Sequence, residues 1–271
     1  MKGVMKLLGK LIIVILIGII VVVGNAVFGN PASKMIVKQS SKEYIKDMYP
    51  NTDYYVDTVK YSFKSSRYYA HIKSESSEDT YFSVVYNSFG KVQYDNYEKY
   101  VSDGFNTWNR INEEYRNKVD DEIKKLPFKI EHIYGEIQTL DKGNNSLNFG
   151  LDMNSLELDK EYNIKDIGSK YGKITLYAYS EEVSYYEAGK ILRETKKQLD
   201  SNNISFYTID FKLRSSENEN IKDWQDKEAI VLEDFLYSDI DENNLENKIE
   251  NHIKNKEECY KYLDKKEIKK G

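Results

Sequence analysis

An apolar segment near the N-terminus constrains this chain more than any other feature of its sequence. The first ten residues contain three lysines and no acidic residue, and an apolar run follows them directly. It extends over residues 11–28, and a helix of about 18 residues is about 27 Å long, close to the thickness of the hydrocarbon core of a bilayer. The sequence therefore predicts a transmembrane helix. The side chains expected to contact lipid are Leu11, Ile12, Ile13, Val14, Ile15, Leu16, Ile17, Ile19, Ile20, Val21, Val22 and Val23.

The charges around this helix predict its orientation. Lys2, Lys6 and Lys10 precede it, and the first acidic residue of the chain is Glu43. By the positive-inside rule, residues 1–10 are cytoplasmic and the chain from about residue 29 onward lies outside. We therefore expect a single-pass protein of a bacterial cell membrane, with the lipid bilayer as its first partner and most of its mass extracytoplasmic.

A cleavable signal peptide is the alternative interpretation of the same segment. Small residues at Gly24 and Ala26 fit a cleavage site, and the mature, secreted protein would then begin at Val27. We favour retention because the apolar run continues into Val27 and Phe28. The only cysteine, Cys259, is far from the apolar run, so neither a lipid attachment site nor an intramolecular disulfide is predicted.

The length and charge of the remaining chain limit what it can do. About 240 residues follow the helix, enough for one large or two ordinary domains that hold together by burial alone. Without the three N-terminal lysines, 37 basic residues remain against 45 acidic ones, a net charge of −8. Such an acidic surface argues against nucleic acid as a partner.

Residues 32–126 are predicted to form a first α+β domain. A helix is expected over residues 33–48, because apolar residues recur on one face and Pro50 follows. Four strands come next, with alternating apolar and polar residues and short turns that make them antiparallel. A long amphipathic helix, apolar from Val101 to Leu126, should then cover one face of this sheet, and Pro127 marks its end. The expected strands centre on residues 59–63, 68–72, 82–86 and 92–94.

Residues 127–271 are predicted to form a second α+β domain. Strands are expected near residues 133–140 and 174–178, followed by a helix with an apolar face over residues 188–199. The segments 204–213 and 229–237 are apolar on both faces, which predicts central strands of a covered sheet, and a charged helix closes the chain from residue 241 to 266. The order allows a split β-α-β element. The fold class is thus α+β, a transmembrane helix followed by two small domains of antiparallel sheet plus helix.

The best metal-binding pattern lies before the last helix. Asp239, Asp241, Asn243 and Glu250 match positions 1, 3, 5 and 12 of an EF-hand loop. Asn244 stands where the loop needs glycine, and the preceding segment reads as a strand instead of a helix. We therefore predict no metal site here and interpret Asp239 or Asp241 as a cap of the last helix. The acidic loop 74–79 is likewise interpreted as a solvated connection.

Catalytic signatures are weak throughout the chain. The three histidines lie in different segments without a second ligand at metal-binding spacing, and Gly168-Ser169 lacks the nucleophile-elbow spacing. Ser88 and Lys91 form the S-x-x-K pattern, but in a predicted turn. Glu233 and Asp234, side by side on a predicted central strand, are the carboxylates that a general acid–base mechanism would use. No catalytic residue and no cofactor are predicted.

Tyrosine is unusually frequent, with 24 residues, and three pairs are adjacent in sequence. In a strand, such a pair places one ring on each face of the sheet, so one ring of each pair is expected to be exposed. Exposed aromatic rings suit contacts with peptides or glycans, although half-buried strands have the same composition. The pairs are Tyr54-Tyr55, Tyr68-Tyr69 and Tyr185-Tyr186.

Nine short blocks of the sequence carry a resemblance to a known family: residues 29–31, 49–50, 59–64, 79–82, 95–98, 106–110, 134–135, 206–211 and 235–240. They resemble the YfjL-like proteins, membrane-associated proteins of low-GC Gram-positive bacteria that are divided into an N-terminal and a C-terminal domain. The resemblance covers most of the chain in order and implies no activity. The first domain also looks like small exported modules of the PepSY or cystatin type, an analogy of fold alone.

Two functions are compatible with these features. The first is a non-catalytic interaction or sensing module on the membrane, with an extracytoplasmic protein, a peptide or a cell-wall component as its partner. The second is an exported hydrolase that uses paired carboxylates such as Glu233 and Asp234. The first is favoured by an anchor and two domains without a catalytic set.

Overall fold

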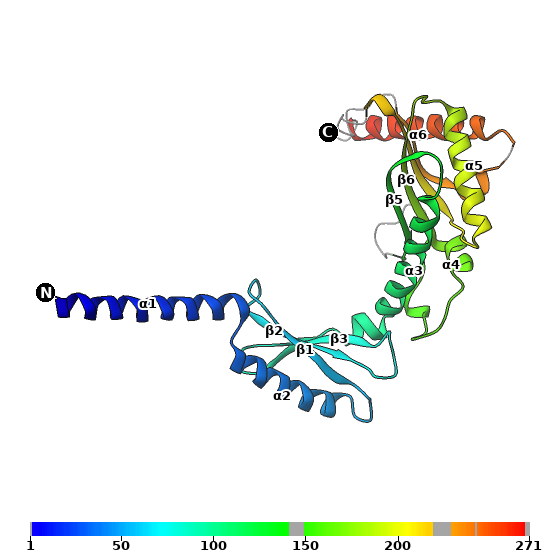
Figure 1. Cartoon of the computed structure of the whole chain (residues 1–271). Helices are drawn as coiled ribbons and strands as arrows, with labels where there is room; N and C mark the ends of the chain where they lie inside the picture. The colour runs from blue at the N-terminus through cyan, green and yellow to red at the C-terminus, as the bar shows by residue number, and fades with distance from the viewer. Residues whose placement is uncertain (1, 141–148, 219–228, 242, 269–271) are drawn as a thin grey trace. The chain divides into compact units, whose positions relative to one another are not determined.

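The computed structural model has an α+β fold with two four-stranded sheets (Figure 1). It describes residues 2–140, 149–218, 229–241 and 243–268. The chain divides into two compact units, hereafter the first and the second unit. The first comprises residues 1–107 and 154–159, and the second comprises residues 108–153 and 160–271.

Helix α1, Lys2–Phe28, contains every residue expected to contact lipid. Its described apolar side chains between residues 11 and 23 are all exposed. A helix that is apolar on all sides and leaves its side chains uncovered by the protein fits an apolar surrounding. By length and composition α1 could cross a membrane, and a signal sequence would share these properties.

After α1, the first unit contains α2 and an antiparallel sheet in the order β1-β2-β3-β4 (Figure 1). The helix begins because the Asn30 side chain accepts a hydrogen bond from the Ala32 N–H at 2.8 Å and Pro31 occupies the first position. The predicted helix and two hairpins are confirmed. Their bounds are α2 Pro31–Met48, β1 Tyr55–Ser62, β2 Arg67–Lys73, β3 Tyr81–Tyr86 and β4 Val92–Asp95.

The core of the first unit lies between α2 and one face of this sheet. Val37 and Ile45 point from the helix to residues that alternate along β2 and β3. This alternation of buried and exposed residues is the pattern from which the strands were predicted. The buried strand residues are Tyr68, Ala70, Ile72, Phe82, Val84 and Tyr86.

The helix in the structure differs from the one predicted from Val101 to Leu126, both in where it begins and ends and in the sheet on which it packs. A π-helical turn, Glu98–Ser102, precedes Gly104, whose positive φ of 74° separates it from α3, Phe105–Ile123. The buried face of α3 packs on the second sheet, where the Trp108 indole N–H donates to the Ile137 carbonyl at 2.9 Å. Helical periodicity reveals an apolar face but not the sheet that it covers. The first segment of the first unit ends at Thr107, whereas the predicted domain boundary lies near Pro127.

The second unit contains a mixed sheet in the order β5-β6-β7-β8. Strands β6 and β7 are parallel neighbours joined through α5, while the other two strand pairs are antiparallel. The sequence analysis predicted an antiparallel sheet for this domain, and the structure differs from that prediction in one strand pair, which is parallel. The β-α-β element is not split, because no strand lies between β6 and β7. The bounds are β5 Lys129–Ile137, α4 Ile164–Tyr171, β6 Gly172–Ser180, α5 Tyr185–Ser201, β7 Thr208–Ser215, β8 Ile230–Leu236 and α6 Leu245–Ile268.

One of the two predicted central strands is an edge strand. β7 is central and mostly buried, whereas β8 has β7 as its only neighbour among the described strands. In β8, Ile230, Leu232 and Phe235 are buried, while Val231 and Leu236 are exposed. An apolar run in sequence therefore did not mean burial on both faces, because exposed positions of an edge strand tolerate apolar residues.

Candidate functional site

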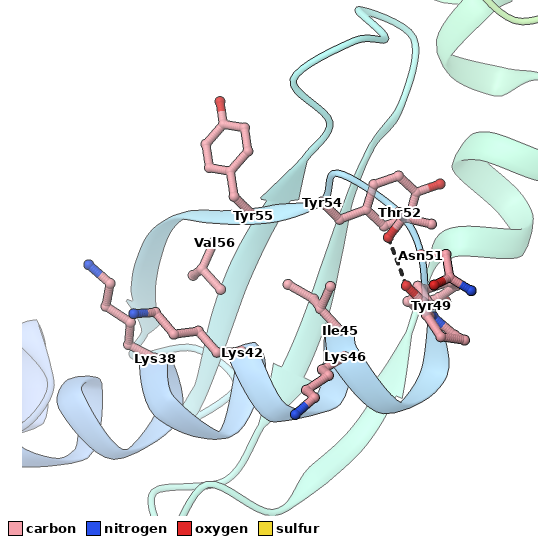
Figure 2. A pocket seen from close by; sticks show the side chains of 11 residues that line it. Lys38, Lys42, Ile45, Lys46, Tyr49, Asn51, Thr52, Tyr54, Tyr55 and Val56 are labelled. Atoms are coloured by element: carbon pink, nitrogen blue, oxygen red, sulfur yellow. Dashed lines mark hydrogen bonds between the residues drawn. The ribbon is translucent and has the colours of Figure 1, made fainter.

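A groove of about 690 Å³ opens between α2 and the start of β1 in the first unit (Figure 2). This size lies within the range of small-molecule and peptide sites. Ile45 and Val56 lie between the helix and the strand and form the apolar floor, as Figure 2 shows. The remaining lining residues are Lys38, Lys42, Lys46, Tyr49, Pro50, Asn51, Thr52, Tyr54 and Tyr55.

One wall of the groove is a row of lysines on α2. Lys38, Lys42 and Lys46 follow each other at four-residue intervals, so they are neighbours along the helix and about 6 Å apart in rise. All three are exposed, and no carboxylate among the described residues forms an ion pair with them. The side of the helix that packs on the sheet is Val37, Ser41 and Ile45, directly beside this row. The wall therefore presents unneutralised positive charge.

The opposite wall is aromatic and held in place from behind. Tyr49 contacts Tyr54 and Tyr97 with ring centroids 5.6 and 4.8 Å apart. The Tyr49 hydroxyl donates to the Asp95 carboxylate at 3.0 Å, and Tyr44 donates to the same oxygen. Burial, followed by the proximity of Asp95, raises the pKa of Tyr49, so its hydroxyl stays a donor at neutral pH. These contacts give the wall a fixed shape.

The backbone of β1 borders the same groove. β1 is an edge strand, and its outer side pairs with no other strand in the described part of the chain. Edge strands carry N–H and C=O groups that another extended segment can pair with. A bulge between Val56 and Thr58 and the ion pair of Asp57 with Lys73 at 3.3 Å lie at the inner side, toward β2. The groove thus combines charge, aromatic rings and an unpaired strand edge.

A second hollow, of about 420 Å³, lies beside α5 in the second unit, but most of the charged side chains that line it already have partners. Arg193 pairs with Glu246 at 2.8 Å, and the Lys196 ammonium donates to the Tyr237 and Ile240 carbonyls. The Tyr237 hydroxyl donates to the Asp200 carboxylate at 2.8 Å. We therefore regard the groove of the first unit as the stronger candidate.

The tyrosines predict how stability changes at high pH. Burial and the Asp200 hydrogen bond raise the pKa of Tyr237 to about 12, and burial also raises the pKa of Tyr49, Tyr54 and Tyr115. The pKa of tyrosine in the unfolded chain is about 10. The stabilisation that these four side chains provide is therefore complete below about pH 10 and decreases as the pH rises toward their pKa values in the folded protein. The urea midpoint should fall between about pH 8 and about pH 11. An unchanged midpoint over this range would contradict the assignment.

The four EF-hand positions do not converge on a cation site. Asp241 pairs with Lys248 and Glu250 with Lys254, each at 2.6 Å. Asp239 ends a short turn, Tyr237–Asp239, that follows strand β8, so no helix enters the loop from this side. The cap assigned to Asp239 or Asp241 is wrong, because α6 begins only at Leu245, directly after Asn244. Asn244 has a φ of 62°, the conformation that glycine would otherwise supply.

The adjacent acids Glu233 and Asp234 point to different partners. Glu233 pairs with Lys256 of α6 at 2.9 Å, whereas Asp234 pairs with Lys173 of β6 at 2.9 Å. Asp210 joins this second cluster, 2.8 Å from the same ammonium. Burial opposes protonation of Lys173, but the two carboxylates outweigh it and raise its pKa. A lysine thus bridges the two acids that come together, Asp210 and Asp234. Glu233 and Asp234 diverge at an irregularity of β8, where the register with β7 shifts and Asp234 has a φ of 52°.

The other sequence candidates are distributed over the chain. His71 contacts the Ser83 hydroxyl, His132 packs near Tyr177, and His252 contacts the Glu233 carbonyl. Ser88 lies in the β3–β4 turn as predicted, and Cys259 lies within α6. Among the described residues no group of three His, Cys, Asp or Glu side chains could hold a metal ion.

Hydrogen bonds to Asp53 and Asp159 hold the acidic loop 74–79 in place. Asp53 accepts from the Ser74 hydroxyl and the Ser76 N–H, both at 2.7 Å. The Asp79 carboxylate accepts from the Asp159 N–H at 2.9 Å, and Asp159 accepts in return from the Asp79 N–H at 3.0 Å. These bonds join residues 154–159 to the first unit.

The tyrosine pairs follow the strand rule only where they lie in strands. In β2, Tyr68 is buried and Tyr69 is partly exposed, while Tyr185 and Tyr186 begin α5 and are both exposed. The groove itself was not found from the sequence. Its one signal is the run of lysines at four-residue spacing, which also fits an ordinary solvated helix face.

Comparisons with known proteins identify the family. The YfjL-like N-terminal domain matches residues 4–96 and the YfjL-like C-terminal domain matches residues 114–250. No curated protein matches the chain. A crystal structure of a DUF5037 family protein from Ruminococcus gnavus shares 12% sequence identity, with a TM-score of 0.21 over 66% of this chain and 74% of that chain. A TM-score this low supports no argument. The two domain matches cover most of the sequence in order, and the chain belongs to the YfjL-like family.

Proposed function

We propose that this protein is a membrane-anchored, non-catalytic binding module of the bacterial cell envelope. Helix α1 would span the membrane with residues 1–10 in the cytoplasm, so that the chain from residue 29 onward lies outside it. The groove between α2 and β1 would bind an extended acidic peptide segment of an extracytoplasmic partner.

The observation that carries the proposal is the juxtaposition of the lysine row with the free edge of β1. An extended peptide can add to an edge strand through main-chain hydrogen bonds, while pockets beside the strand select its side chains. Alternate side chains of such a peptide point to one side, toward α2. Acidic residues there would meet Lys38, Lys42 and Lys46, which have no carboxylate partner among the described residues.

The rigid aromatic wall supports the same function. Tyr49 and Tyr54 offer ring faces, and their contacts with Tyr97 and Phe82 fix them before a ligand arrives. Fixed side chains lose little entropy on binding, so the groove is pre-organised. The hydrolase hypothesis has no comparable support, because Glu233 and Asp234 are not brought together.

Charge reversal in the groove should abolish most of this binding. We expect a triple variant to weaken binding by about 2 kcal/mol, or roughly thirtyfold, because three attractions between lysine and peptide carboxylates become repulsions. This variant carries Lys38→Glu, Lys42→Glu and Lys46→Glu. The probe is a fluorescein-labelled peptide of alternating Glu and Val, added to the full chain in detergent. Fluorescence anisotropy measures its dissociation constant, which should also rise with salt.

The control carries the same change in net charge at residues that do not line the groove. Lys124→Glu, Lys165→Glu, Lys170→Glu places three reversals on exposed positions of the second unit and should leave peptide binding unchanged. Equal loss in both variants would show that net charge alone attracts the peptide. If poly(glycerol phosphate) binds in the groove and the acidic peptide does not, the ligand is a wall polymer and the peptide assignment is wrong.

A further inference from the structure

The first unit is attached to α1 at one defined end of its sheet. Gly29 and Asn30 follow α1 directly, and the Asn30 N–H donates to the Tyr68 hydroxyl at 2.9 Å. Gly29 is buried and has a φ of 75°, and a Cβ at this position would lie 2.6 Å from the Tyr61 side chain. Two residues span at most about 7 Å. The ends of β1 and β2 therefore lie within a few residues' reach of the end of α1.

Both hairpin turns lie at this end. Tyr61 pairs with Tyr68, and Tyr68 pairs with Tyr86, so the turns after β1 and after β3 are on the same side of the sheet. The β3–β4 turn also packs on α2, because a Cβ at Gly90 would lie 2.8 Å from Ile36. We call this surface the junction end, formed by residues 29–36, 62–67 and 87–91.

The junction end is basic and carries exposed apolar tips. Its three segments contain Lys34, Lys64, Arg67 and Lys91 and no acidic residue. Phe89 at the second hairpin tip is 85% exposed, and Phe63 at the first is 62% exposed. The loop at the opposite end of the sheet, residues 74–80, contains Glu75, Glu78 and Asp79 and no basic residue. The loops at the two ends of the sheet therefore differ in charge.

We propose that the junction end rests on the outer surface of the membrane that α1 spans. Phe63 and Phe89 would enter the interfacial layer, where aromatic rings are favoured, and the four basic side chains would face anionic phospholipid head groups. The acidic loop would point away from the bilayer. This inference rests on the proposed function, because it needs α1 in the membrane, and it would hold the peptide groove at a fixed height above the lipid.

Accessibility of labels at the two ends tests the proposal in the full chain. Single cysteines are introduced as Ser88→Cys beside Phe89 and as Ser76→Cys in the acidic loop, both with Cys259→Ser, and are labelled with NBD. The protein is reconstituted into phosphatidylcholine vesicles containing phosphatidylglycerol. We expect the label at position 88 to be several-fold less accessible to iodide than the label at position 76. Phe63→Ser with Phe89→Ser should remove most of this difference.

Vesicle flotation separates the two possible failures. Protein that does not float with the vesicles lacks the anchor, which overturns the proposed function and this inference together. Protein that floats but shows equal iodide access at both positions overturns the inference alone. Protection that is the same in vesicles without phosphatidylglycerol would overturn the role of the basic residues.

Discussion

Tyr115→Ala is expected to lower the free energy of unfolding of the second unit by about 4 kcal/mol, the loss typical of truncating a large buried aromatic side chain. Tyr115 is fully buried on α3, and its hydroxyl donates to the Ser205 carbonyl at 3.0 Å. A Cβ at Gly168 or Gly172 would lie less than 3 Å from the ring or its hydroxyl, so these two neighbours of the ring have no side chain that could fill the space. Urea unfolding of the full chain in detergent measures the change.

Trp108 on α3 belongs to the second unit, so in a chain that carries Trp224→Phe the tryptophan fluorescence follows this unit alone. Tyr115→Phe is the matched control. It keeps the ring but leaves the Ser205 carbonyl without its donor, at a cost of about 1 to 2 kcal/mol. If Tyr115→Ala does not shift the urea midpoint measured by tryptophan fluorescence, α3 does not hold the second unit together and its assignment there is wrong.

Two arginines in the centre of α1 are expected to detach the protein from the membrane. The twelve Leu, Ile and Val residues between Leu11 and Val23 favour insertion by about 0.5 kcal/mol each, or roughly 6 kcal/mol together. An arginine at the helix centre costs about 3 kcal/mol, so Leu16→Arg with Ile19→Arg cancels this preference. Carbonate extraction of cell membranes measures the retained fraction. Leu16→Ala with Ile19→Ala should leave most of the protein in the membrane.

The N-terminus of the protein isolated from cells distinguishes an anchor from a signal peptide. A retained anchor keeps residues 1–28, and Ala26→Phe should then change nothing. If mass spectrometry finds a chain that begins at Val27, and if Ala26→Phe blocks this cleavage, the protein is secreted and the membrane proposal is wrong.

Strands and helices of the first unit could be predicted because each buries one face. Ala70 and Ile72 in β2, or Val37 and Ile45 in α2, repeat at the period of their own element, and the local sequence contains that period in full. The edge position of β8 could not be predicted, because Val231 and Leu236 make it look buried on both faces. Burial on a given face depends on a neighbour that comes from elsewhere in the chain.

The candidate site also combines features that can be predicted from the local sequence with features that only tertiary contacts create. The lysine row on α2 can be read from its spacing, but the groove exists only because β1 and the tyrosines at residues 49 and 54 lie opposite to it. Conversely, Glu233 and Asp234 are neighbours in sequence and separate in space. Asp210 and Asp234, which are 24 residues apart, meet at one lysine because β7 and β8 pair.

By itself, the sequence determined an N-terminal helix long and apolar enough to span a membrane, the α+β class and the position of most strands and helices. These properties depend on composition and on local periodicity. Only the tertiary structure decided that α3 joins the second sheet, that β6 and β7 are parallel, and which charges remain unpaired in the groove. These properties depend on contacts between segments distant in the chain, and such contacts leave no period in the sequence.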